Sequence, residues 1–152
     1  MSGECGVCAI HRSATARADF AWESTRWVLR HHRNPAPLNG WFLLDSKRHV
    51  GSAADFDAVE EREFAGVLAR SMRAIREVLG VPRVYVVMFG EGAHHVHAHL
   101  IPRDPTIEGT AAWAVADWYR AVQVGGRLPA DPAQIGQSIA RVAALMQGAV
   151  IS

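Results

Sequence analysis

The longest regular pattern of apolar and polar residues predicts an amphipathic helix over residues 55–80. Apolar residues recur there at spacings of three and four, which places them on one face of a helix. They are Phe64, Val67, Leu68, Met72, Ile75, Val78 and Leu79. Asp55 or Asp57 can cap the first turn, and Gly80 with Pro82 ends the last one.

Shorter apolar runs predict four strands. Their ranges are 22–30, 41–46, 84–89 and 95–101. Pro35 and Pro37 interrupt regular structure between the first two. Glycines at positions 90 and 92 form a turn between the last two, and Pro102 closes the final run. The last two strands are therefore expected to pair as an antiparallel hairpin.

Two further helices are predicted near the C-terminus, over residues 111–122 and 132–147. Asp131 can cap the second helix, and Gly148 can stop it. The two helices are expected either to pack on the core or to form a dimer arm. Residues 1–152 are predicted to be one domain, with a core over about residues 5–104 and a helical extension over about residues 110–148.

Composition and charge exclude several classes of partner. The 152 residues carry a net charge of +1, so neither nucleic acid nor an anionic membrane attracts the chain as a whole. No apolar run approaches the roughly 18 residues of a membrane span, and the N-terminus lacks the features of a secretory signal. A cytoplasmic location is expected. The two cysteines, Cys5 and Cys8, then favour metal binding or redox chemistry over a disulfide.

Four of the eight histidines lie between His94 and His99. On a strand, side chains alternate between faces, so His95, His97 and His99 should share one face. Val96, Ala98 and Leu100 should share the other and form part of the core. Two chemistries remain open for the histidine face. The rings can bind a catalytic transition metal, or one ring can attack an electrophilic phosphorus while its neighbours fix the tautomer.

The sequence HVHAHLI, residues 95–101, resembles the signature of the histidine-triad superfamily of nucleotide hydrolases and transferases. The sequence NGWFLLDSKRHV, residues 39–50, is similar to the glycine-led strand and basic-histidine segment of that family. The resemblance covers about residues 5–104. It implies an α+β fold, in which a long helix crosses a five-stranded antiparallel sheet, with the C-terminal helices added. It also implies a homodimer.

The resemblance also implies an activity and its residues. His97 matches the middle histidine of the motif and would attack the α-phosphorus of a bound nucleotide or nucleotide conjugate. His95 and His99 complete the catalytic triad, and His99 would hydrogen-bond the phosphate. The expected function is hydrolysis of a phosphoanhydride or phosphoramidate bond through a nucleotidyl-His97 intermediate. A nucleotidyltransferase with the same intermediate and a non-catalytic nucleotide-binding or partner-binding protein are the alternatives.

Some members of the family hold zinc with a C-x-x-C pair and two histidines. The matching positions here are Cys5, Cys8, His49 and His95. The resemblance thus implies one structural zinc per chain, since two cysteines and two histidines form a closed tetrahedral set. The alternatives are two incidental cysteines or a redox pair.

The chain departs from the family pattern at two places. Glu91 and Gly92 stand where family members commonly have a Gln-Ser or Gln-Thr pair, and we assign them to substrate binding. Glu91 can equally be a solvated turn residue. Arg30 or Arg33 falls near the position of the acidic residue that usually binds the ribose hydroxyls.

Overall fold

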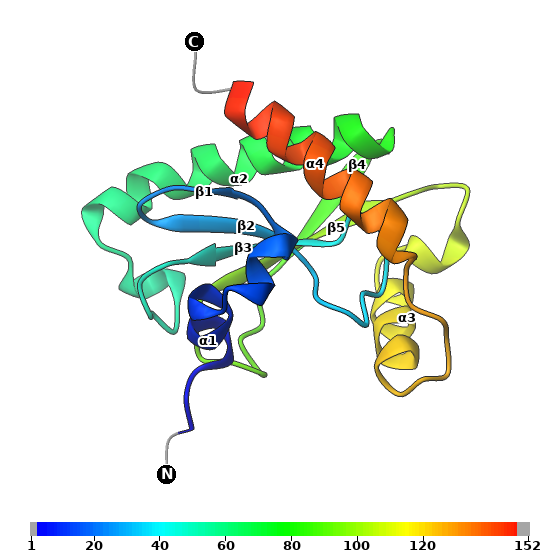
Figure 1. Cartoon of the computed structure of the whole chain (residues 1–152), viewed down its shortest axis with the longest axis horizontal. Coiled ribbons are helices and arrows are strands. Elements are labelled where there is room, and N and C mark those ends of the chain that lie inside the picture. Colours follow the sequence, from blue (N-terminus) through cyan, green and yellow to red (C-terminus); the bar gives the residue numbers. More distant parts are fainter. Residues whose placement is uncertain (1–2, 149–152) are drawn as a thin grey trace.

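A five-stranded antiparallel sheet forms the centre of the protein, in the order β1-β2-β3-β5-β4 (Figure 1). This computed structural model describes residues 3–148. The strands are β1 (Phe20–Glu23), β2 (Trp27–His31), β3 (Phe42–Ser46), β4 (Arg83–Val87) and β5 (His97–Arg103). The expected α+β fold with a five-stranded antiparallel sheet is confirmed.

Helices lie on both faces of the sheet (Figure 1). One face is covered by α2 (Ala58–Leu79) and α4 (Pro132–Gly148), which pack against each other. The other face carries the shorter helices α1 (Gly6–Arg12) and α3 (Ala114–Gln123). Within residues 3–148 there are also three 3-10 turns: η1 (Thr15–Asp19), η2 (Ala53–Asp55) and η3 (Glu108–Thr110).

The main hydrophobic core lies between the sheet and the α2/α4 layer. Alternate residues of the strands point into it and meet the apolar stripe of α2. The buried members are Ala21, Trp27, Leu29, Phe42, Leu44, Val67, Ala74, Ile75, Val78, Val84, Ala98, Leu100, Val142 and Met146. Val142 and Met146 belong to α4, so the last helix packs on the core, one of the two placements expected for it.

The ends of α2 follow the predicted chemistry. Asp57 accepts hydrogen bonds from the backbone N–H groups of Val59 and Glu60, and the Glu60 carboxylate accepts one from the backbone of Asp57. This capping box starts the helix at Ala58, because it satisfies donors that the first turn leaves free. Gly80 ends the helix in the left-handed conformation, at φ 65°.

The prediction of a single strand over residues 22–30 is wrong. The structure divides this segment into β1 and β2, which pair with each other as an antiparallel hairpin. The Ser24 hydroxyl accepts hydrogen bonds from the backbone N–H groups of Arg26 and Trp27, and this local bonding forms the turn. Serine competes with a strand ladder in this way, and the apolar composition on both sides of it concealed the turn.

The predicted strand over residues 95–101 is shifted in the structure. Strand β5 begins at His97 and continues through Pro102 to Arg103. Pro102 is tolerated because it lies beyond Leu100, the last residue of β5 that pairs with β3.

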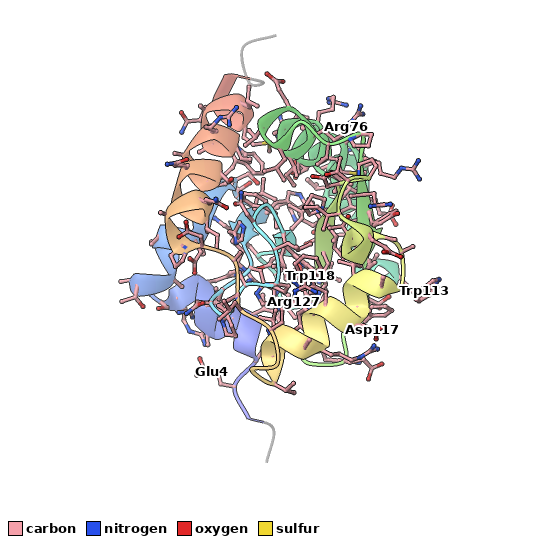
Figure 2. The ribbon with its side chains drawn as sticks, turned by 90° about the vertical axis from the view of Figure 1, so that its right-hand side faces the viewer. Glu4, Arg76, Trp113, Asp117, Trp118 and Arg127 are labelled. Carbon is pink, nitrogen blue, oxygen red and sulfur yellow. The ribbon has the colours of Figure 1, made fainter. Side chains whose placement is uncertain are left out.

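Helix α3 covers part of the second face of the sheet. Val115 and Tyr119 of α3 pack on Trp41, Leu43 and Ile101. In the loop after α3, the Arg127 guanidinium lies 3.3 Å from the ring centre of Trp118 (Figure 2). Among residues 3–148, no helix is both long enough and apolar enough to cross a membrane.

Candidate active site and metal centre

The side chains of β5 alternate between core and cavity. Ala98 and Leu100 are fully buried in the core under α2 and α4. His97 and His99 point to the opposite face and line a cavity. The predicted alternation is therefore confirmed for these four residues. His95 precedes the strand and is buried at the edge of the same face, with 1% of its surface exposed.

The cavity has a volume of about 590 Å³ and lies on the sheet between α1 and α3. Its floor includes a row of cross-strand neighbours, in which Arg30 pairs with Leu43, Leu43 with His99, and His99 with Val87. The next row holds His97, paired with Asp45. Further lining comes from α1, from α3 and from the turn after β4, so segments far apart in the chain enclose the two histidines.

The ring of His97 is held with one nitrogen free for chemistry. Its Nδ1 lies 2.6 Å from the carbonyl oxygen of His95. A carbonyl oxygen can only accept, so Nδ1 carries the proton and Nε2 carries the lone pair. An imidazole in this state is a nucleophile through Nε2.

The ring of His99 is held in the opposite tautomer. The indole N–H of Trp41 donates to Nδ1 of His99 at 3.0 Å. Indole is only a donor, so Nδ1 is unprotonated and the proton of the neutral ring is on Nε2. Burial, with the neighbouring His97, lowers the pKa of His99 to about 3. His99 is therefore a neutral hydrogen-bond donor over the working pH range of most enzymes.

A Cys2His2 cluster lies beside these rings. The side chains of Cys5, Cys8, His49 and His95 place their ligand atoms within 4.8 Å of one another. Nδ1 of His95 lies 3.5 Å from Sγ of Cys5 and 3.4 Å from Sγ of Cys8, and Nδ1 of His49 lies 3.4 Å from the Cys8 sulfur. Zinc at about 2.3 Å from sulfur and about 2.1 Å from nitrogen requires a tetrahedral S···N edge of about 3.6 Å. The predicted ligands are therefore together, at separations that fit a tetrahedral metal ion.

The third histidine ring is also oriented by its backbone contacts. Nε2 of His95 donates to the carbonyl oxygen of Ser46 at 2.6 Å, which leaves Nδ1 as the lone pair that faces the cysteines. The carbonyl oxygen of the same residue orients His97. His95 therefore connects the metal centre to the ring with the free Nε2.

Asp45 of β3 links its own strand to β2 and to α1 under the cavity. It is fully buried, and its Oδ2 accepts from Nε of Arg30 at 2.6 Å and from Nε2 of His11 at 3.0 Å. Burial alone would raise the pKa of Asp45, but Arg30 and then His11 hold it below its usual value. The ionised carboxylate thus links β2 and β3 to α1, the helix that carries Cys8.

Comparison with solved structures identifies the fold. The chain is similar to a zinc-bound histidine-triad family protein from Mycobacterium smegmatis, at 19% identity and a TM-score of 0.67, covering 96% of this chain and 97% of that one. A histidine-triad protein from Marinobacter aquaeolei is similar at 17% identity and a TM-score of 0.64, covering 90% and 96%. The chain has the histidine-triad fold.

A uridylyltransferase shares this fold over part of its length. It is similar at 17% identity and a TM-score of 0.69, and the match covers 97% of this chain but 46% of the uridylyltransferase. No protein-family model and no curated protein matches the sequence. The recognition of a histidine-triad protein from its motif is thus supported at the level of the fold.

The histidine-triad fold brings the predicted site residues to two adjacent places. His97, His99, Glu91 and Gly92 line the cavity, while Cys5, Cys8, His49 and His95 form the cluster next to it. His95 was expected in both sets, and the structure places it in the cluster.

Several lining residues were missed. Leu43 lies on β3 and Trp41 lies two residues before it, so the strand period could have placed both on the histidine face. Trp113 and Tyr119 of the α3 region also line the cavity, and no local sequence signal indicates that this helix returns to the sheet.

Proposed function

We propose that this chain is a nucleotide hydrolase that cleaves a phosphoanhydride or phosphoramidate bond through a nucleotidyl-His97 intermediate. The observation that carries the proposal is the pair of opposite tautomers in the cavity. His97 offers a lone pair at Nε2, and His99 offers a proton at Nε2. A nucleophile beside a neutral donor suits attack on a phosphorus whose oxygens need a hydrogen bond as charge develops.

The proposed reaction has two displacements. In the first, Nε2 of His97 forms a bond to the α-phosphorus and the bond to the leaving group breaks, with the electron pair departing on its oxygen or nitrogen. In the second, water attacks the same phosphorus, releases a proton to the solvent, and the P–N bond breaks, which returns the lone pair to His97. His99 would donate to a non-bridging oxygen in both steps. Glu91 and Gly92 would lie on the leaving-group side.

We further propose that the Cys2His2 cluster holds one structural zinc ion. The donor set is closed, so the metal would supply cross-linking and orientation rather than an open position for substrate. Cys5, Cys8 and His49 would fix His95, whose carbonyl oxygen orients the nucleophile. The similarity to a zinc-bound histidine-triad protein supports this choice of metal.

Turnover of nucleoside phosphoramidates and dinucleoside polyphosphates tests the proposal. The purified protein should release nucleoside monophosphate, and peptide mass spectrometry after acid-free quenching should find the nucleotidyl group on His97. His97→Ala should lower kcat at least about a thousandfold. His94→Ala is the matched control, because His94 is an exposed neighbour that does not line the cavity. Nucleotide binding without product in any assay would instead support a non-catalytic binding protein.

A nucleotidyltransferase is the second candidate, favoured by the similarity to uridylyltransferase. The same first displacement would be followed by attack from a phosphate or sugar phosphate in place of water. Product analysis with uridine and adenosine substrates, with and without inorganic phosphate, separates the two. A transferase should form little monophosphate until the acceptor is added.

A further inference from the structure

Three arginines line the cavity, and each of them is paired with a carboxylate that does not. They are Arg30 on β2, Arg33 just beyond it and Arg120 on α3, and their partners are Asp45, Asp19 and Asp117. The single carboxylate that lines the described cavity is Glu91, in the turn after β4. The cavity is therefore charged unequally. Its acidic group comes from the turn that precedes the histidine strand, whereas Arg30 and Arg33 come from β2 and the residues after it, on the far side of β3.

Arg30 is oriented by a side-on ion pair. Nε of Arg30 donates to Asp45 at 2.6 Å, and its Nη2 lies 3.4 Å from the other carboxylate oxygen. A guanidinium has five N–H groups, so this pair leaves three for another acceptor. Within residues 3–148, Nη1 makes no hydrogen bond, although only 4% of Arg30 is exposed. Arg30 lines the cavity and Asp45 does not, so the carboxylate holds the guanidinium from outside the cavity.

The position of Arg30 determines how far a group bound to it lies from the catalytic histidines. Arg30 and His99 stand in one row on the same face, separated by β3. Neighbouring strands are about 4.8 Å apart, so the two backbones are about 10 Å apart. Glu91 follows β4, at the opposite end of this row. A group bound at Arg30 would therefore belong to the part of the substrate that lies away from Glu91.

We infer that the cavity selects a nucleotide with a second phosphate, carried as a monoester on the sugar of the part that is transferred to His97. A phosphate monoester offers several acceptor oxygens and up to two charges, which match the free edge of Arg30 together with Arg33 or Arg120. A sugar hydroxyl can also accept from Arg30, but it offers one neutral hydrogen bond where a phosphate monoester accepts several charge-assisted ones. This inference rests on the proposed nucleotide function and names the substrate class for it.

Calorimetric titration with two pairs of ligands tests this inference. Adenosine 3′,5′-bisphosphate and adenosine 2′,5′-bisphosphate should each be compared with adenosine 5′-monophosphate, with uridine counterparts alongside. At least one bisphosphate should bind about tenfold more tightly or better, the factor that corresponds to one charge-assisted hydrogen bond. The advantage should shrink as salt is added, because the outer arginines are exposed to solvent.

Two arginine variants test whether the arginines cause the tighter binding of bisphosphates. Arg33→Gln should weaken the binding of the bisphosphate more than that of the monophosphate, and so reduce the bisphosphate preference. Arg30→Lys keeps a cation for Asp45 but loses the second edge of the fork, so it should remove more of the preference. Arg17→Gln is the matched control, since Arg17 is also exposed and paired with a carboxylate but lies outside the cavity.

The outcomes separate this inference from the proposed function. Equal affinity for monophosphate and bisphosphates, with turnover intact, would overturn the second-phosphate site alone. Failure of every nucleotide to bind would overturn both proposals. If Arg30→Lys does not fold, the comparison of ligands on the unchanged protein and on Arg33→Gln still decides the question.

Discussion

At the scale of single residues, the hydrogen bond from Trp41 to His99 has a measurable consequence. Trp41→Phe keeps an aromatic ring in a position that is 4% exposed but removes the only N–H that reaches Nδ1 of His99 among the described residues. Nδ1 then becomes free to take a proton, so the pKa of His99 should rise and both neutral tautomers should be populated. The expected loss in kcat is about tenfold, the scale of one hydrogen bond.

Nitrogen-15 spectra of the histidine rings and a pH–rate profile measure this effect. The Trp41→Phe spectrum should show mixed tautomers for His99, and the acid limb of the profile should move toward neutral pH. Trp22→Phe is the control, because Trp22 packs against the core on the opposite face of the sheet. An unchanged His99 spectrum in Trp41→Phe would show that the indole does not set the tautomer.

A second residue makes folding sensitive to acid. His31 is fully buried, donates from Nδ1 to the carbonyl oxygen of His32 and accepts at Nε2 from the backbone N–H of Gly40. Burial lowers its pKa from 6.5 to about 4. Between these values the unfolded chain binds the proton and the folded chain does not, so the free energy of unfolding falls as pH falls from 6.5 to 4.

The size of this effect is bounded by the pKa difference, at up to about 3 kcal/mol. Urea unfolding at several pH values, with and without added zinc, measures it. His31→Gln can keep one donor and one acceptor without titrating, so its stability should depend less steeply on pH than that of the unchanged protein. His94→Gln serves as the exposed control. Identical slopes for the unchanged protein and His31→Gln would contradict the assignment to His31.

The residues that could be predicted from the sequence are those whose chemistry depends on identity and short spacing. Alternation placed His97 and His99 on one face, and the resemblance brought Cys5 and Cys8 to His95 across 87 positions or more. The donors and acceptors that set each tautomer could not be predicted. They depend on which backbone carbonyl or indole lies within 3 Å of a ring, and that follows from tertiary packing.

At the scale of elements, α1 is held to the sheet by few groups. It is seven residues long, too short to be stable alone, and one of its residues, Val7, is buried. Cys8 in the helix, Cys5 just before it and the His11–Asp45 pair connect it to β3 and to the segment before β5. Loss of the proposed zinc should therefore release α1 and open one wall of the cavity.

Elemental analysis and hydrogen exchange test this role of the metal. The unchanged protein should contain one zinc per chain, and Cys8→Ser should lose it and exchange faster in residues 6–12. His97→Ala and His99→Ala should keep the full zinc content, because neither ring belongs to the cluster. Loss of zinc in His97→Ala would instead support a catalytic metal on the histidine row.

Elements were predictable where a periodic pattern met a clear stop signal. The long helix had both an apolar stripe and end signals, and α2 agrees with the prediction within three residues at its start. The hairpin of β1 and β2 was hidden because its turn contains Ser24, Thr25 and Arg26 rather than glycine or proline. Packing of α3 on the sheet was one of its two expected placements, but the residues that it contacts were not predictable, since they share no local pattern with it.

At the scale of the whole molecule, the two edges of the sheet differ. Strand β1 is packed against α4, whereas β4 ends the sheet and has exposed apolar residues at and just beyond it. Val86, Met88 and Phe89 are 37%, 40% and 72% exposed. An open edge with apolar side chains favours pairing with another strand. Together with the resemblance, this favours a homodimer in which two β4 strands meet.

Light scattering after size exclusion should find two chains per particle at micromolar concentration. Val86→Lys and Met88→Lys should each shift the protein toward the monomer, because a charge that must be buried opposes strand pairing. Leu128→Lys is the control, since Leu128 is also apolar and 87% exposed but lies in the loop before α4.

Because β4 leads into the turn with Glu91, the monomeric variants should also bind nucleotide more weakly if that edge orders the turn. A particle of one chain at every concentration would contradict the dimer, and a dimer that survives both lysine variants would place the interface elsewhere on the molecule.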